Sequence, residues 1–99
     1  NQTIDHKHIE DEAMFFKVLG DPTRLRIVYT LFGNELCVND LSGKINLSVS
    51  AVSHQLALLR RAKLVASRRE GKQVFYRLDD DHVSTILDVA HTHLSEPGK

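Results

Sequence analysis

The sequence predicts a mainly α-helical chain with one β-hairpin, and three features of its apolar pattern support this prediction. Apolar residues recur at helical spacing through residues 9–62, alternate strictly with other residues from about residue 64, and return to helical spacing after residue 81. Gly71 lies in the middle of the alternating stretch, where it can form the turn between two strands. The expected order is four helices, two strands and a last helix.

The first two helices are predicted by their apolar faces and by the residues at their ends. Gly20 ends the first helix, Asp21 is a natural N-cap for the second, and Pro22 suits the first helical position because its missing N–H has no partner there. Gly33 and Asn34 close the second helix. The inward face of the first helix, over residues 9–19, is expected to comprise Ile9, Ala13, Phe16 and Leu19. That of the second is expected to comprise Leu25, Val28, Leu31 and Phe32.

Two helices joined by a tight turn follow. The shorter one is predicted over residues 38–45, and the longer one starts after Ser48 as N-cap and runs to about Ala62. Asn46 and Leu47 form the turn, which is short enough to make the helices cross steeply, as in a helix-turn-helix. The buried side of the longer helix is expected to comprise Val49, Val52, Leu56 and Leu59.

Strands over residues 64–70 and 73–78 complete the predicted fold class, a winged helix-turn-helix. The last helix is predicted from Asp81 to about Leu94. Its apolar residues are Val83, Ile86, Leu87, Ala90 and Leu94. Residues 1–99 are therefore expected to form a single winged-helix domain, and we expect a homodimer because a core of this size is thin.

Composition limits the class of protein. The apolar content of 41% is ordinary for a soluble globular chain, and no run approaches the ~20 apolar residues that cross a bilayer. The polar, acidic segment Asn1–Glu12 is not expected to be a signal peptide. The single cysteine, Cys37, cannot form an internal disulfide and suits the reducing cytoplasm. An enzyme is not expected, because the sequence has neither a glycine-rich phosphate loop nor a nucleophile with a positioned base.

Basic residues are concentrated in one segment, although the net charge is zero. Residues 60–77 contain seven Lys or Arg residues and one acid, Glu70. Such a segment can bind a polyanion, although on charge alone a solvated surface is an equally good interpretation. The hydroxyl side chains on the longer helix of the pair suit the major groove of double-stranded DNA, and the basic hairpin suits phosphates. The residues expected to contact DNA are Ser48, Ser50, Ser53, His54, Gln55, Arg60, Arg68, Arg69 and Lys72.

Potential metal ligands lie at both ends of the last helix, Asp80 and His82 at its start and His93 and Glu96 at its end. His82 and His93 are eleven residues apart, so they lie on the same side but roughly 16 Å apart. One ion with bonds of about 2.1 Å cannot span that distance. An antiparallel pair of these helices would bring opposite ends together and form two equivalent inter-subunit sites per dimer. His91 falls on the other side of the helix and is expected to lie outside the site.

Two imidazoles and two carboxylates suit a tetrahedral divalent ion, Zn²⁺ in the first place and Co²⁺ or Ni²⁺ as the alternative. Four protein ligands leave no open position for catalysis. Taken singly, Asp80 could equally cap the helix, and the two histidines could pack in an interface. A weaker second metal site is an alternative role for Cys37, although a small buried apolar residue is the simpler interpretation of this cysteine. Its ligands would be Cys37 and Asp40 with His6 or His8 from the N-terminal segment.

Three segments resemble the ArsR/SmtB family of metal-sensing repressors: residues 18–26 (VLGDPTRLR), 35–41 (ELCVNDL) and 47–56 (LSVSAVSHQL). The zinc site on the family's C-terminal helix is matched by Asp80, His82, His93 and Glu96, and Glu96 makes the SmtB-type zinc sensors most similar. The resemblance implies an apo dimer that binds an inverted repeat in operator DNA and loses affinity when Zn²⁺ binds, which derepresses metal-homeostasis genes. The cadmium and lead sensors of the family have a two-cysteine motif where this chain has only Cys37, so a thiolate-rich site is not expected.

Overall fold

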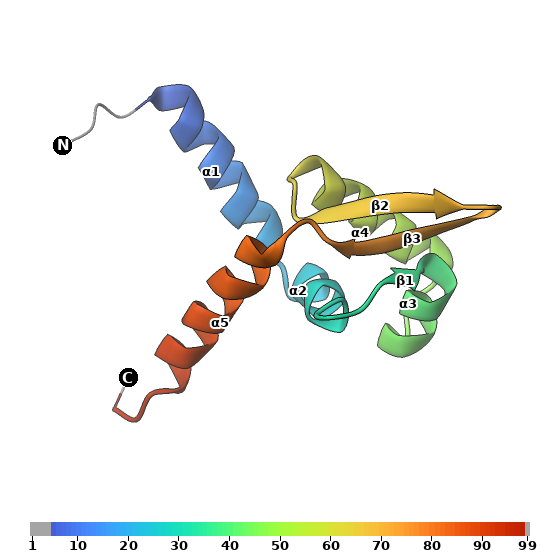
Figure 1. The fold of residues 1–99 in the computed structure, drawn as a ribbon. Helices are drawn as coiled ribbons and strands as arrows, with labels where there is room; N and C mark the ends of the chain where they lie inside the picture. Colours follow the sequence, from blue (N-terminus) through green and yellow to red (C-terminus); the bar gives the residue numbers. More distant parts are fainter. Residues whose placement is uncertain (1–4, 99) are drawn as a thin grey trace.

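The computed structural model describes residues 5–98, which form five helices and three strands (Figure 1). These are α1 (His6–Leu19), α2 (Pro22–Thr30), β1 (Leu36–Cys37), α3 (Val38–Ile45), α4 (Val49–Arg61), β2 (Val65–Glu70), β3 (Gln73–Leu78) and α5 (Asp81–Ser95). The predicted winged helix-turn-helix is confirmed, and β1 is an additional strand. The first four residues of the segment Asn1–Glu12 and the final residue, Lys99, lie outside the described residues. None of the helices in residues 5–98 has the length and apolar content needed to span a membrane.

The helices α2 and α4 start at the caps that the sequence predicts. The side chain of Asp21 accepts a hydrogen bond from the backbone N–H of Arg24 at 3.1 Å, and Ser48 accepts one from that of Ala51 at 3.0 Å, so both predicted N-caps are confirmed. Asn46 ends α3 with a φ of 60°, in the left-handed region that asparagine tolerates better than most residues. That conformation reverses the chain within the short turn between α3 and α4.

The sheet has the strand order β1-β3-β2 with antiparallel pairing throughout. β2 and β3 form the predicted hairpin, in which Val65 pairs with Leu78 and Gly71 occupies the turn with a φ of 63°. β1 is only two residues long and pairs with the middle of β3. A strand this short leaves no alternation in the sequence, so the apolar pattern could not predict it.

The core lies where α2, α3, α4 and the start of β2 meet. The side chains with no exposed surface there are Ile27, Val28, Leu41, Val52, Leu56, Leu59 and Leu64. The last turn of α1 adds Val18 and Leu19, and the first half of α5 adds Val83 and Leu87. Only the ends of α1 and α5 that adjoin the rest of the fold therefore contribute buried side chains.

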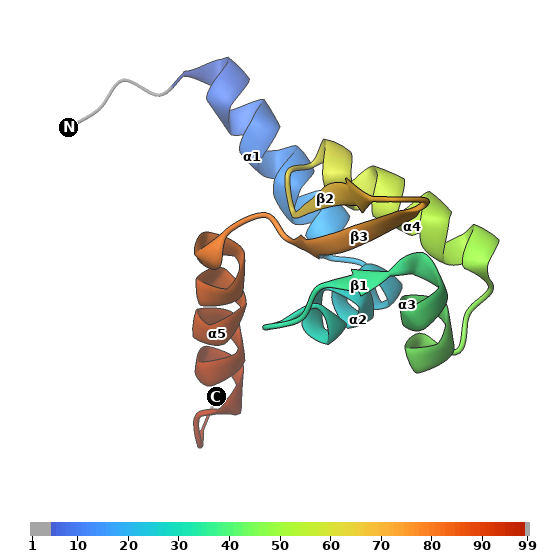
Figure 2. The same cartoon turned by 45° about the vertical axis from the view of Figure 1, so that its right-hand side comes forward.

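The inward face predicted for the first helix is buried only at Leu19, so for a single protomer that prediction is wrong at its other three positions, and part of the apolar face of α5 is exposed as well. Ile9, Ala13 and Phe16 are exposed on α1, where Phe16 keeps 55% of its surface, and Ala90 and Leu94 are exposed on α5. Both helices project from the fold on the side opposite the tip of the hairpin (Figures 1 and 2). Helical spacing identifies an apolar face but does not show whether the same chain covers it.

Candidate nucleic-acid interface and metal centre

One side of α4 is exposed over its whole length. Ser50, Ser53 and His54 lie on that side, and Arg60 is exposed near the end of the helix. The opposite side is fixed in the core by Val52, Leu56 and Leu59. A rigid helix that presents two hydroxyls and an imidazole to solvent suits contact with base edges in a major groove. Figure 2 shows α4 beside the hairpin at one edge of the molecule.

Gln55 does not share this exposed side. It is half-buried, and its side-chain oxygen accepts a hydrogen bond from Arg24 Nη1 at 3.1 Å. Arg24 Nε also donates to the carbonyl of Val18 at 2.6 Å. The structure therefore places Gln55 in a contact that joins the end of α1, the start of α2 and the middle of α4. Residue type and spacing gave no signal for this contact, because its partners are distant in the sequence.

Val49 also differs from the sequence interpretation, whereas Ser48 is exposed as expected. Val49 was expected in the buried stripe, but it is 44% exposed, so that prediction is wrong. Val49 is the first residue of α4 and keeps this exposure although helical spacing places it in line with Val52 and Leu56. Ser48, expected at the DNA surface, is exposed and uses its hydroxyl as the N-cap of α4.

The basic residues of the hairpin have two different environments. Arg68 donates to both carboxylate oxygens of Glu35, at 2.7 and 2.8 Å, and to Glu70 at 2.8 Å. Its guanidinium also lies 5.0 Å from the centre of the Phe75 ring. The hydrogen bond from Arg68 lowers the pKa of the Glu35 carboxyl, and the two carboxylates raise the pKa of Arg68. Arg68 therefore joins the hairpin to the segment before β1.

Arg69 and Lys72 have a different setting. Both are exposed near the tip of the hairpin, on either side of Gly71. This position suits contact with phosphates along a DNA backbone, which adds affinity but carries no sequence information. Of the three hairpin cations expected at DNA, these two have the placement that this role needs.

Asp80 and His82 lie together at the start of α5. Asp80 Oδ1 accepts from the backbone N–H of His82 at 2.8 Å, which makes it the N-cap, and lies 3.2 Å from His82 Nδ1. The backbone hydrogen bond from His82 is the main cause of a lowered pKa at Asp80. Capping and metal binding are therefore compatible here, because the cap holds a carboxylate beside an exposed imidazole.

His93 and Glu96 lie together at the other end of α5. With Asp88, Val89 and Thr92 they line a shallow hollow on the surface. His91 is exposed as well. Within residues 5–98 of one chain, no three His, Cys, Asp or Glu side chains come close enough to hold a metal ion. Each end of α5 thus offers one imidazole and one carboxylate, and this donor set fits a tetrahedral Zn²⁺ ion only if two such ends meet.

The residues expected for a second metal site are not brought together within one chain. Cys37 is buried in β1, and Asp40 is exposed on α3. His6 and His8 lie in the first turn of α1, where His8 Nε2 is 3.6 Å from a carboxylate oxygen of Glu12. Figure 1 shows the start of α1 far from β1 and α3. The buried position of Cys37 agrees with its interpretation as a small apolar residue.

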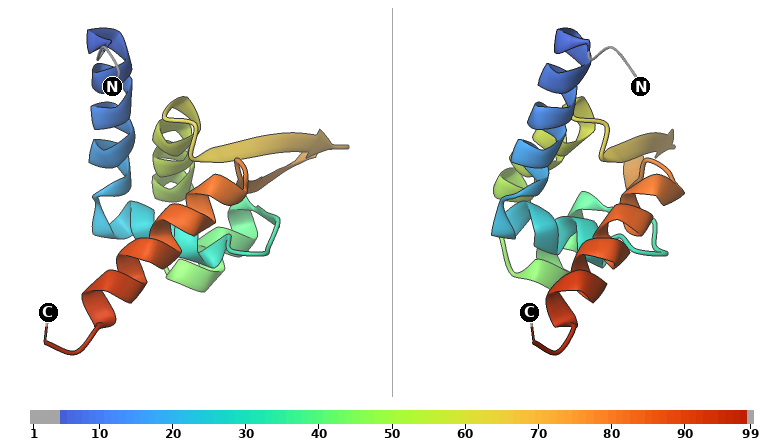
Figure 3. Two further views of the ribbon diagram at one scale, coloured as in Figure 1. Left: turned by 60° about the vertical axis from the view of Figure 1, so that its left-hand side comes forward. Right: turned by 90° about the vertical axis from the view of Figure 1, so that its left-hand side faces the viewer.

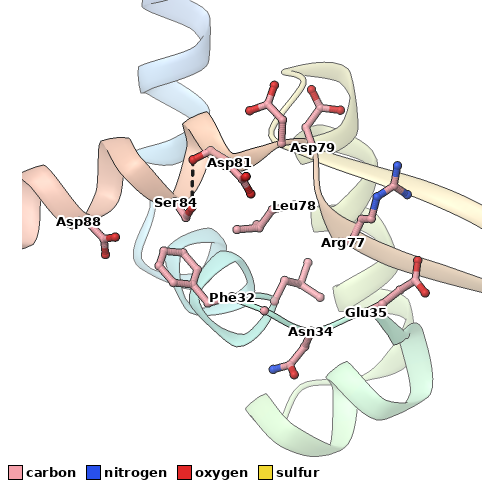
Figure 4. Close-up of a pocket in the computed structure, with 12 residues that line it drawn as sticks. Phe32, Asn34, Glu35, Arg77, Leu78, Asp79, Asp81, Ser84 and Asp88 are labelled. Carbon is pink, nitrogen blue, oxygen red and sulfur yellow. Dashed lines mark hydrogen bonds between the residues drawn. The ribbon is translucent and has the colours of Figure 1, made fainter.

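An acidic hollow lies between the loop after α2, the end of β3 and the start of α5 (Figure 4). Phe32 and Leu78 form its apolar part, and Asp79, Asp81 and Asp88 lie around it. Residue patterns in the sequence give no signal for this hollow, because its lining comes from three separate segments. The concentration of carboxylates would repel a phosphate backbone, so this side of the molecule does not suit contact with DNA.

The chain matches the family described as "Bacterial regulatory protein, arsR family" over residues 21–67, from the N-cap of α2 into β2. It is 48% identical over 84 residues to the "Transcriptional repressor SmtB homolog" of Synechocystis sp., covering 85% of this chain and 64% of that protein. The chain thus spans slightly less than two thirds of this relative. It is 42% identical over 87 residues to the "Cadmium resistance transcriptional regulatory protein CadC homolog" of Staphylococcus aureus, covering 87% of this chain and 72% of that protein.

The fold is also similar to that of solved regulators. The structure of HlyU from Vibrio cholerae superposes with a TM-score of 0.80 at 35% identity and covers 93% of this chain and 100% of that one. All three of these relatives are transcriptional regulators, which agrees with the expectation that the chain is not an enzyme.

Proposed function

The chain belongs to the ArsR family of bacterial transcriptional regulators, and we propose that it is a repressor whose homodimer binds operator DNA and releases it when Zn²⁺ binds. The observation that carries the proposal is the placement of the four expected metal ligands, Asp80 and His82 at one end of α5 and His93 and Glu96 at the other. Each end has one histidine and one carboxylate, and the chain itself does not bring them together. A dimer with antiparallel α5 helices would complete two such sites.

The exposed apolar side chains support the dimer. Ile9 and Phe16 on α1, and Val89 and Leu94 on α5, keep between 43% and 76% of their surface exposed. Apolar residues that gather on two neighbouring projections of a small protein usually mark an interface. A two-fold arrangement would cover both helices and place two α4 helices in successive major grooves, as an inverted repeat in the DNA requires.

A physical connection leads from the dimer helices to α4. The end of α1 is tied to α4 through Arg24, which donates to the carbonyl of Val18 and to the side chain of Gln55. A change in the relative position of the two protomers would therefore also change the separation of their α4 helices. If that separation no longer matches successive major grooves, specific affinity falls. Zn²⁺, when bound, would supply bonds between the protomers, and DNA must then weaken Zn²⁺ binding by the same factor.

A mobility-shift titration tests the proposal, using duplexes selected by the protein from a random pool. We expect Zn²⁺ to lower the affinity of the unmodified chain for these duplexes by about 5- to 150-fold, the usual range of coupling between sites. His93→Ala should bind the same duplexes without metal and show no response to Zn²⁺. His91→Ala is the matched control on the same helix and should respond normally. An undiminished response in His93→Ala would refute the α5 site.

The same titration with Co²⁺ and Ni²⁺ separates the alternative effectors. A tetrahedral set of two imidazoles and two carboxylates suits Zn²⁺ and Co²⁺, whereas Ni²⁺ commonly takes more than four ligands. We therefore expect Co²⁺ to release the DNA and Ni²⁺ to do so less effectively. A response led by Ni²⁺ would indicate that further ligands, beyond the four on α5, join the site.

A further inference from the structure

One exposed apolar side chain is left without a role in the proposed dimer. Among the described residues, seven large apolar side chains are exposed, and five of them lie on α1 and α5. Of the other two, Tyr29 has its ring 5.0 Å from that of Phe32. Val49 is the remaining one, and it is 44% exposed at the first position of α4.

Val49 lies at the edge of the exposed side of α4, the side that carries Ser50, Ser53 and His54. Residues four apart on a helix are neighbours on its surface, so Val49 lies next to Ser53, which is exposed. Ser50, which follows Val49 directly, is exposed as well. The first residues of a recognition helix are the ones that contact base edges in the major groove. Val49 therefore lies at a position of the proposed recognition helix where a polar side chain would be expected.

The chemistry of valine limits what it can recognise in that groove. Its side chain has no hydrogen-bond donor or acceptor, so it cannot satisfy the polar edges of guanine, cytosine or adenine, and covering them without a hydrogen bond is unfavourable. The C5 methyl group of thymine is the apolar feature of the major-groove edges. A contact between two apolar groups removes both from water and is favourable.

We infer that Val49 contacts a thymine methyl group and so makes the protein select thymine at one position in each half-site. This inference rests on the proposed DNA-binding function and adds a specificity-determining residue to it. Ser53 and His54 then select neighbouring bases by hydrogen bonding, and Val49 adds an apolar contact beside them.

The experiment removes the methyl group and keeps the base pair. Operators are first selected from a random pool with the unmodified chain, and each thymidine in a half-site is then replaced by deoxyuridine, symmetrically in both half-sites. Affinities are measured by fluorescence anisotropy at one fixed salt concentration, because salt changes every DNA affinity. We expect one symmetric position at which the replacement weakens binding by about tenfold, or about three- to fourfold per half-site, as expected for one buried methyl group.

Two variants identify the side chain responsible. Val49→Ala should bind the thymidine and deoxyuridine operators equally at that position. Alanine is a better helix former than valine, so α4 should be preserved. Arg69→Ala is the control: it should weaken binding to both operators and keep their ratio unchanged. An unmodified chain that is indifferent to deoxyuridine at every position, or a Val49→Ala variant that keeps the wild-type ratio, would overturn the inference. Failure to select any duplex would instead refute the DNA-binding function itself.

Discussion

The two helices α4 and α5 are similar in length, with 13 and 15 residues, but they are held in the fold very differently. α4 buries Val52, Leu56 and Leu59 completely, at positions spread from its beginning to its end. α5 buries only Val83 and Leu87, both in its first half, and then extends away from the fold (Figure 3). The helix proposed to read DNA is thus supported by its own chain along its length, while the helix proposed to sense metal is supported only in its first half.

This difference separates two kinds of function. The exposed side of α4 is positioned by the core of one protomer, so its ability to contact bases depends on the fold of that protomer. The proposed metal ligands of α5 are divided between its ends, and the apolar residues of its second half are exposed, so the function proposed for this helix depends on a second chain. Substitutions in the two helices should therefore differ both in size and in how their effects depend on protein concentration.

The largest expected effect is on the free energy of unfolding, and it separates two leucine-to-alanine substitutions, one in α4 and one in α5. Leu56→Ala removes a leucine with no exposed surface and should lower the free energy of unfolding by about 2–5 kcal/mol. Leu94→Ala removes a leucine that is 76% exposed in one chain. It should change the dissociation constant of the dimer instead, as measured by sedimentation equilibrium, and so make stability more dependent on protein concentration. An unchanged dissociation constant in Leu94→Ala would remove α5 from the interface.

The helices and the hairpin could be predicted from the sequence because their signals are local. Caps such as Asp21 and Ser48, and the change from helical spacing to alternation, lie within a few residues of the elements they define. β1 could not be predicted, because two residues carry no period and their partners lie about forty residues away. The sequence could not show that apolar residues of α1 and α5 are exposed in one chain either, since helical spacing does not tell whether the same chain or a second one buries them.

The candidate site shows the same division between local and distant signals. Ser50, Ser53 and His54 could be identified from helical spacing, and the structure exposes all three. Residue type could not show whether Gln55 and Arg68 are available to contact DNA. Gln55 is hydrogen-bonded to Arg24 and Arg68 to Glu35, and each partner is more than thirty residues away in the sequence. Whether a polar side chain is available for DNA depends on such partners, which only the folded chain shows.

A second experiment separates base contacts from phosphate contacts. Ser53→Ala should lower the affinity for the selected operator about three- to tenfold and leave the affinity for random DNA nearly unchanged, because it would remove the hydrogen bond to a base that we propose for Ser53. Arg69→Ala should weaken binding to both and reduce the salt dependence by roughly 0.9 in the log–log slope, which corresponds to one phosphate contact. Equal losses of specificity in the two variants would mean that α4 is not the main reader.

The smallest expected effect is the pH dependence of the free energy of unfolding that comes from the ion pair of Glu35 with Arg68 in the hairpin. The pKa of Glu35 is lowered in the folded state by its hydrogen bonds from Arg68, so the pair stabilises the fold above the unfolded-state pKa of about 4.3. This stabilisation is lost as the pH falls through the lowered pKa of the folded state. Glu35→Gln should therefore be less stable than the unmodified chain at pH 7, and the difference should shrink as the pH falls below about 4.3. Urea unfolding across this range checks the direction, and a difference that grows on acidification would contradict it.

Complementation between two variants tests most directly whether the metal site is shared between protomers. One variant carries Asp80→Asn and His82→Ala, in which asparagine preserves the cap of α5. The other carries His93→Ala and Glu96→Ala. In an antiparallel dimer, each homodimer of these variants lacks two ligands at both sites. A heterodimer has one site with all four ligands and one with none.

The measurement is a Zn²⁺ titration of the two homodimers and of the heterodimer, purified with two different affinity tags after co-expression. We predict no tight Zn²⁺ binding to either homodimer and one tightly bound ion per heterodimer. Tight binding to a homodimer would show that one end of α5 is sufficient. A heterodimer that binds no more tightly than the homodimers would contradict a site built from Asp80 and His82 of one protomer and His93 and Glu96 of its partner.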